Sequence, residues 1–162
     1  MWQPFTGNFG SQKQILTHIL HNNYGPPPDF SNEQNAWDEV IPYSNYLEYN
    51  LDYRCVSLQT FVNDIADSVP NKRTMMVLFG DDFTFQNAFM SYRGLDKLID
   101  YCNKNQKTNM QFKYSTPGKY LDALKLETGV EYKVVKHDFF PYYQDRLRFW
   151  SGFFTSRPDF KK

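Results

Sequence analysis

One short stretch limits the possible folds of this chain more than any other. Residues 75–79 form an apolar run of strand length that stops at Gly80, and two carboxylates, Asp81 and Asp82, follow directly. In α/β proteins, ligands and catalytic groups collect at the carboxyl ends of parallel strands, so paired acids in this position are a candidate site. The same pattern also fits two solvated acids, or an acid that caps the next helix. Spacing alone leaves both interpretations open.

The sequence around this stretch alternates between helical and strand-like patterns. Apolar residues recur at the helical period over 57–69 and 92–104, and a third helix is expected where Pro117 follows the capping residue Thr116. The strand-like runs are residues 74–80, 110–115 and 131–136. Strands that alternate with helices pair in parallel through right-handed crossovers. The predicted fold class is therefore α/β, with a helix followed by a β-α-β-α-β core over residues 57–162.

This topology brings the ends of the predicted strands to one edge of the sheet. Asp81 and Asp82, the turn at Ser115-Thr116 and the pair His137-Asp138 are expected there together. Neighbouring residues of a strand face opposite sides, so the two acids after Gly80 point inward together only if the chain turns or bulges. One of them is expected to be catalytic and the other to support it. His137 is not expected to take part in catalysis.

The first 56 residues carry weaker signals and are predicted to be an irregular, loop-rich lead-in. Ser11 is a possible N-cap for a helix over 11–21, and Gly25 with the three prolines after it breaks regular structure. Residues 29–56 mix aromatic and acidic side chains, which is typical of a long loop over a site or of a disordered segment. His18 and His21 lie three residues apart, but surface histidines explain this pair better than a metal site.

Charge and composition exclude several classes of partner. The chain has 18 basic and 18 acidic residues among 162, so no positive surplus points to nucleic acid or to an anionic membrane surface. No apolar run approaches membrane-spanning length, and no signal peptide is visible at the N-terminus. Aromatic residues make up 19% of the chain, which fits either an aromatic core or a sugar site walled by rings. The spacing of Cys55 and Cys102 leaves open whether they are free or paired.

Five sequence blocks, in order, resemble one enzyme family, the class II α-mannosidases of glycoside hydrolase family thirty-eight. They are Gly80 to Ala88 (GDDFTFQNA), Leu95 to Ile99 (LDKLI), Tyr114 to Pro117 (YSTP), His137 to Tyr142 (HDFFPY) and Trp150 to Pro158 (WSGFFTSRP). The resemblance is strong from about Met75 onward and weaker before it. The YSTP and HDFFPY blocks resemble the lysosomal type of the family more than the Golgi type.

The resemblance implies a fold, a reaction and roles for three residues. The family's catalytic domain is a seven-stranded β/α barrel, so this chain would be a partial (β/α) barrel. Family members hydrolyse terminal α-D-mannose from glycans and retain the anomeric configuration. Asp82 matches the general acid/base, Asp81 matches a companion carboxylate in the sugar pocket, and Trp150 matches a ring near the sugar. The implied substrate is a mannose-containing oligosaccharide, and the implied compartment is the lysosome or vacuole.

The family pattern also includes parts that this sequence lacks. Family members hold a zinc ion through a His-x-Asp motif, the nucleophilic aspartate and a later histidine, and none of these segments is present here. No residue of this chain is therefore predicted to bind the zinc. We expect residues 1–162 to be one incomplete catalytic domain, an internal fragment that works with the remainder of the mannosidase polypeptide and is inactive alone.

Two other hypotheses belong to different classes of function. The chain could be a non-catalytic remnant that folds as a small α/β module and binds carbohydrate or protein without turnover. An unrelated flavodoxin-like nucleotide-binding domain is the third possibility. That hypothesis is disfavoured because no glycine-rich phosphate loop follows any predicted strand, and Asp81 and Asp82 would repel phosphate.

Overall fold

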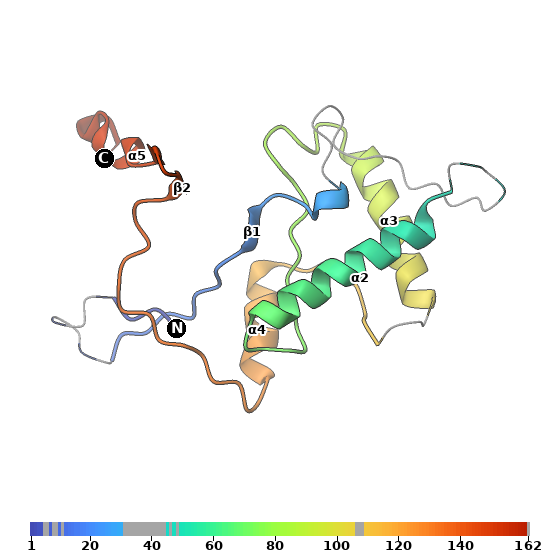
Figure 1. Cartoon of the computed structure of the whole chain (residues 1–162), viewed down its shortest axis with the longest axis horizontal. Coiled ribbons are helices and arrows are strands. Elements are labelled where there is room, and N and C mark those ends of the chain that lie inside the picture. Colours follow the sequence, from blue (N-terminus) through green and yellow to red (C-terminus); the bar gives the residue numbers. More distant parts are fainter. Residues whose placement is uncertain are drawn as a thin grey trace. The chain divides into compact units, whose positions relative to one another are not determined.

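The computed structural model describes residues 1–4, 7, 10, 12–30, 45, 47, 49–105 and 109–161 (Figure 1). The described chain divides into two compact units, one made of Ile19–Glu131 and the other of Met1–His18 together with Tyr132–Lys162. Each unit is described by itself. The expected assignment of residues 1–162 to one incomplete catalytic domain stays a prediction.

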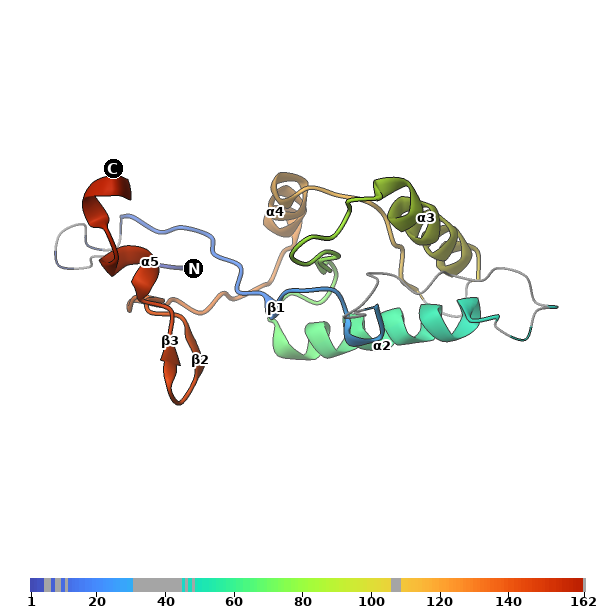
Figure 2. The ribbon, with the colours of Figure 1, turned by 90° about the horizontal axis from the view of Figure 1, so that it is seen from above.

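The described residues of the unit Ile19–Glu131 contain three α-helices, and the helical pattern of the sequence predicted all three (Figures 1 and 2). They are α2 (Leu51–Ser68), α3 (Ala88–Lys104) and α4 (Pro117–Leu126). Short elements precede them, namely β1 (His21–Tyr24) and the 3-10 turn η1 (Pro28–Phe30). Helix α2 begins six residues before the predicted start at Ser57, so the irregular lead-in predicted to reach residue 56 ends earlier.

The centre of this unit is a cluster of buried side chains between α2 and α3. Its members are Phe30, Leu51, Cys55, Leu58, Leu98 and Cys102. Four residues are predicted to face inward from α3. Leu95, Leu98 and Cys102 are buried, and Ile99 is half-buried. A disulfide joins Cys55 of α2 to Cys102 of α3, which settles the question that the spacing of the two cysteines left open.

Helix α4 begins as its sequence predicts. Thr116 has extended backbone dihedrals, and its Oγ1 accepts a hydrogen bond from the Lys119 N–H at 3.3 Å. Pro117 occupies the first turn, where its missing N–H costs nothing. Tyr120 and Leu124 are buried, so the predicted inward face of the helix is confirmed.

The three segments predicted as parallel strands do not form a sheet among the described residues. Residues 74–80 and 110–115 carry no strand, and 131–136 contains only an isolated bridge at Val135. A strand is defined by hydrogen bonds to a neighbouring strand, and the described residues offer these segments no such partner. The partial (β/α) barrel remains a prediction that this arrangement neither supports nor tests.

The other unit has a different organisation from the one predicted. A helix was expected over residues 11–21, but the described part of this segment is irregular and leads into β1. The backbones of Trp2 and Ile15 form an antiparallel bridge with two hydrogen bonds of 2.8 Å, and Trp2 also bridges Val135 in parallel. These distant backbone contacts replace the local hydrogen bonds of a helix, so the helical prediction is wrong here.

The C-terminal residues form a small hairpin that the sequence analysis missed. Strands β2 (Tyr143–Asp145) and β3 (Arg148–Phe149) pair antiparallel, and two short helical turns follow, α5 (Gly152–Thr155) and η2 (Pro158–Lys161). The long loop predicted over 29–56 falls largely outside the described residues, including Trp37, Tyr43 and Tyr46. No helix among the described residues is both long and apolar enough to cross a membrane.

Candidate active site

The apolar run of residues 75–79 ends in a tight turn at Gly80, as its sequence suggests. The φ angle of Gly80 is 152°, a value that side-chain-bearing residues rarely adopt. A Cβ atom at this position would lie 3.2 Å from the Phe85 ring, closer than an ordinary van der Waals contact. Glycine therefore lets the chain turn directly in front of Asp81 and Asp82.

Hydrogen bonds within the turn give the two acids different roles. The Asp81 N–H donates to Thr84 Oγ1 at 2.9 Å, while Thr84 Oγ1 and the Thr84 N–H both donate to the Asp81 carbonyl oxygen. The Asp81 carboxylate accepts the Asp82 N–H at 2.7 Å. Asp81 is therefore engaged in holding its own turn, and both acids are exposed to solvent.

The carboxylate of Asp82 meets a hydroxyl from a distant part of the same unit. Tyr24, the last residue of β1, donates its hydroxyl hydrogen to Asp82 Oδ1 at 3.1 Å. This contact spans 58 residues of sequence and was not predicted. A hydrogen bond from a tyrosine fixes one carboxylate oxygen and leaves the other able to exchange a proton with a bound molecule.

A row of aromatic rings connects this turn to the second segment predicted to end at the site. Phe85 lies 5.8 Å from Tyr92 between ring centroids, and Tyr92 lies 5.8 Å from Tyr114. The Tyr114 hydroxyl donates to Asp96 Oδ1 at 2.9 Å. Partial desolvation of this half-exposed side chain, followed by the hydrogen bond to Asp96, raises the pKa of Tyr114. The row joins the Asp81-Asp82 turn to the residue just before Ser115-Thr116, within one unit.

Two bulky residues of the turn region adopt an unusual backbone conformation. Phe83 and Phe85 have φ angles of 61° and 62°, in the left-handed region that large side chains avoid. Phe83 is also 87% exposed. Such conformations concentrate at functional sites, where surrounding structure compensates their cost.

Trp150, the third residue with a predicted role, belongs to the other unit. Its ring stacks on Phe153 at 5.6 Å and lies 5.9 Å from Tyr142, and its Nε1 donates to Gln144 Oε1 at 2.7 Å. Trp150 is 45% exposed. The role of Trp150 beside Asp82 stays a prediction, because the two residues lie in separate units.

His137 and Asp138 lie in the same unit as Trp150. His137 Nδ1 is 2.9 Å from the Asp138 carbonyl oxygen, and the His137 carbonyl accepts the Trp2 Nε1–H at 3.2 Å. Across the described ranges, no group of three His, Cys, Asp or Glu side chains is arranged to hold a metal ion. The described residues therefore do not form a zinc site by themselves.

The sequence of this chain is similar to those of known proteins. Residues 1–145 match the model of the glycosyl hydrolases family 38 N-terminal domain. A protein named probable alpha-mannosidase from Arabidopsis thaliana is 36% identical over 158 residues, which cover 94% of this chain and 14% of that relative. Lysosomal alpha-mannosidases of Dictyostelium discoideum and Bos taurus are 34% and 31% identical over 93% and 100% of this chain. The chain spans 15% and 16% of their lengths.

Proposed function

Because this chain belongs to glycosyl hydrolase family 38, we propose that it is part of a retaining α-mannosidase that removes terminal α-D-mannose from oligosaccharides or glycoprotein glycans. The observation that carries the proposal is the family match over residues 1–145, which includes the turn with Asp81 and Asp82. The chain covers a small part of its relatives, so the reaction is assigned to the polypeptide that contains it. The chain alone is proposed to be inactive.

In this proposal Asp82 is the general acid/base of the reaction. Glycoside cleavage needs a proton for the departing oxygen, and in a retaining enzyme a second carboxylate attacks the anomeric carbon. Asp82 protonates the leaving oxygen through its second carboxylate oxygen, while Tyr24 holds Oδ1. The same group then removes a proton from the water that releases the sugar. Asp81 keeps the turn in place and faces the sugar pocket as a supporting acid.

The nucleophile and the zinc ion of the family are proposed to come from other parts of the enzyme. When bound, a zinc ion would polarise and orient sugar hydroxyls. Among the described residues of this chain, no group of side chains could hold such an ion, and the roles proposed for Asp82 and Asp81 are stated for these two carboxylates themselves. The lysosomal names of several relatives support a lysosomal or vacuolar location.

The test is Asp82→Asn in the polypeptide that carries the complete domain. Loss of a general acid costs about 10²–10⁴-fold in rate, and the loss is largest when the leaving group is poor. We therefore expect turnover of an alkyl or natural mannoside to fall by about 1,000-fold, with a much smaller loss for a dinitrophenyl mannoside in the first, glycosylation step.

Two controls separate this role from a structural one. Asp122→Asn removes an exposed acid on α4, which no proposed step uses, and is expected to leave the rates unchanged. Azide should restore part of the Asp82→Asn rate on the activated substrate, because this anion attacks the glycosyl-enzyme without needing a base. Wild-type rates of Asp82→Asn on an alkyl mannoside would contradict the assignment.

The exposed rings around Trp150 favour one second candidate, a carbohydrate-binding module without turnover. Trp150 stacks on Phe153 and is partly exposed, and an exposed aromatic ring can pack on the apolar face of a sugar ring. Titration of the 162-residue chain with mannobiose, followed by tryptophan fluorescence, tests it. A saturable change that Trp150→Phe removes, with no hydrolysis, would favour binding alone.

A further inference from the structure

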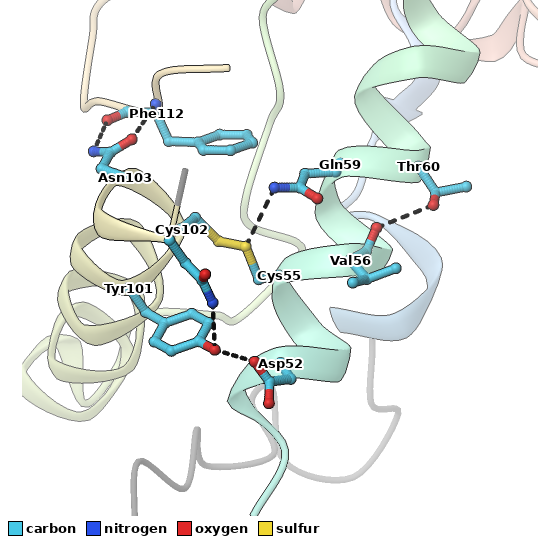
Figure 3. The surroundings of a disulfide bond; sticks show 10 residues. Asp52, Cys55, Val56, Gln59, Thr60, Tyr101, Cys102, Asn103 and Phe112 are labelled. Carbon is cyan, nitrogen blue, oxygen red and sulfur yellow. Dashed lines mark hydrogen bonds between the residues drawn. A yellow bond between two sulfur atoms is a disulfide. The ribbon is translucent and has the colours of Figure 1, made fainter. Parts of the chain in front are cut away.

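The disulfide Cys55–Cys102 is a covalent link in the middle of the helical unit, and the proposed reaction does not use it. Cys55 lies on α2 and Cys102 on α3, with their Cα atoms 5.7 Å apart and a sequence separation of 47 residues. Both residues are almost fully buried, with 4% and 2% of their surface exposed. Figure 3 shows the two sulfurs between the facing sides of the helices.

The segment that leads to Asp81 and Asp82 rests on the cluster that contains this disulfide. Val77 and Phe79, four and two residues before Asp81, pack against the cluster of Phe30, Leu51, Cys55, Leu58, Leu98 and Cys102. The rings of Phe79 and Phe30 meet edge to face at 5.4 Å. The position of the turn at Gly80 therefore depends on how α2 and α3 are held together.

A second segment, residues 110–115, is hydrogen-bonded to Asn103, the residue next to Cys102. The Asn103 side chain donates from Nδ2 to the Phe112 carbonyl and accepts the Phe112 N–H at Oδ1, both at 2.8 Å (Figure 3). Phe112 also packs against the buried cluster. The last turn of α3 thus connects residues 110–115 to the same pair of helices, two residues before Tyr114 at the end of the aromatic row.

Other contacts between the two helices lie beside the disulfide. The Tyr101 hydroxyl donates to Asp52 beside the disulfide, and Leu98 packs between the helices. The buried cluster itself has six members. In a core of this size a cross-link that closes a long loop removes a large part of the unfolded chain's freedom.

We propose that the Cys55–Cys102 disulfide is a redox-sensitive clamp that holds residues 75–82, with the turn before Asp82, on α2 and α3. Two thiols form it by exchange with a small-molecule disulfide, which takes up the two electrons and two protons and leaves as two thiols. A dithiol reductant reverses the reaction and becomes a disulfide itself. Because both sulfurs are buried, the exchange needs local opening of the helix pair.

The consequence for catalysis rests on the function proposed above, but the clamp itself does not. If Asp82 has no role in glycoside cleavage, the disulfide still controls the order of residues 75–82. The test therefore measures backbone protection in the 162-residue chain and requires no activity.

Hydrogen exchange of the chain, followed by mass spectrometry, provides the test. Non-reducing peptide maps should first show Cys55 and Cys102 in one linked pair of peptides. With a dithiol reductant, exchange should then rise about 100-fold in peptides covering 75–82 and 110–115, because the helix pair opens more often. Peptides of α4, which makes neither contact, should change much less.

A paired variant excludes other effects of the reductant. Cys55→Ala/Cys102→Ala should show the fast exchange at 75–82 without reductant, and reductant should then change nothing further. Free thiols in the isolated chain, unchanged exchange at 75–82 after reduction, or an equal rise across α4 and the whole unit would each overturn the clamp. The last outcome would identify a cross-link that supports the entire unit.

Discussion

The two units of this chain use similar aromatic-rich sequences in opposite ways. All ten buried hydrophobic residues among the described positions lie in the unit Ile19–Glu131. The other unit carries a dense series of exposed aromatic side chains over residues 139–160. Among the described residues of that unit, only the polar Gln3 is buried. Its rings contact one another, as in the Phe140–Phe154 pair with centroids 4.4 Å apart, yet remain about half exposed.

The difference shows that aromatic content does not decide where a core forms. In the helical unit, aliphatic residues at the helical period place one face of α2 against one face of α3, and the disulfide joins the two faces. In the other unit, the secondary structure elements are two to four residues long and have no sustained apolar face. Aromatic rings in such short elements contact neighbouring rings but remain exposed to solvent.

Truncating one leucine in each unit should give the largest contrast. Leu98 is 1% exposed in the helical core, whereas Leu147 of the hairpin is 90% exposed. Leu98→Ala leaves a cavity, so we expect a loss of about 2–5 kcal/mol in the free energy of unfolding. Leu147→Ala should change it by less than about 0.5 kcal/mol. Urea unfolding followed by far-UV circular dichroism measures both.

Equal effects of these two substitutions would show that the hairpin contributes a core of its own. A Leu126→Ala variant provides a further control, because this leucine belongs to α4 in the helical unit but is 81% exposed. It should behave like Leu147→Ala. Burial, rather than membership of the unit, would then account for the loss at Leu98.

The same contrast explains which parts of the fold the sequence could predict. Helices α2, α3 and α4 were predicted because periodic apolar residues and the Thr116-Pro117 start are local signals. The helix expected over 11–21 is wrong because Ile15 pairs with Trp2, a contact that no local pattern contains. The hairpin of β2 and β3 was missed because its strands are two and three residues long and its turn has neither glycine nor proline.

The candidate site divides in the same way between local and distant contacts. Gly80 and the two acids after it were found from their order in the sequence, and the structure places a tight turn there. Tyr24 was missed because it reaches Asp82 from 58 residues away and carries no motif. Whether Cys55 and Cys102 are free or bonded could not be predicted either, because their spacing in the sequence does not show whether the two thiols lie close together in the fold.

Replacing the residue that precedes a helix in each unit should give a smaller contrast in stability. Thr116 caps α4 through the hydrogen bond from the Lys119 N–H, whereas Ser151 precedes α5 without any side-chain cap. Thr116→Ala should lower the free energy of unfolding by about 1 kcal/mol, because a helix N–H loses its partner. Ser151→Ala should have almost no effect. Thermal melts of both variants test this, and a loss for Ser151→Ala as large as for Thr116→Ala would contradict the assigned caps.

The smallest expected effect concerns an ion pair at the tip of the hairpin. Hydrogen bonds, first from the Arg148 side chain and then from the Leu147 N–H, lower the pKa of Asp145 from its ordinary value of 3.8. The Arg148 Nε donates to Asp145 Oδ2 at 2.5 Å, and the Leu147 N–H donates to Oδ1 at 3.1 Å. A carboxyl whose pKa is lower in the folded state stabilises the fold above its ordinary pKa. This contribution disappears as the pH falls through the lower, folded value.

An NMR titration of the Asp145 side-chain carbonyl should therefore show a midpoint below the ordinary carboxyl range. Arg148→Gln should raise the midpoint only part of the way back, because the Leu147 N–H still donates to the carboxylate. Arg146→Gln removes a neighbouring charge without breaking the pair and should leave the midpoint where it is. An equal rise for both variants would mean that general charge, rather than the Arg148 hydrogen bond, sets the pKa. The hydrogen bond from Arg148 would then contribute no more to the pKa of Asp145 than an unbonded neighbouring charge does.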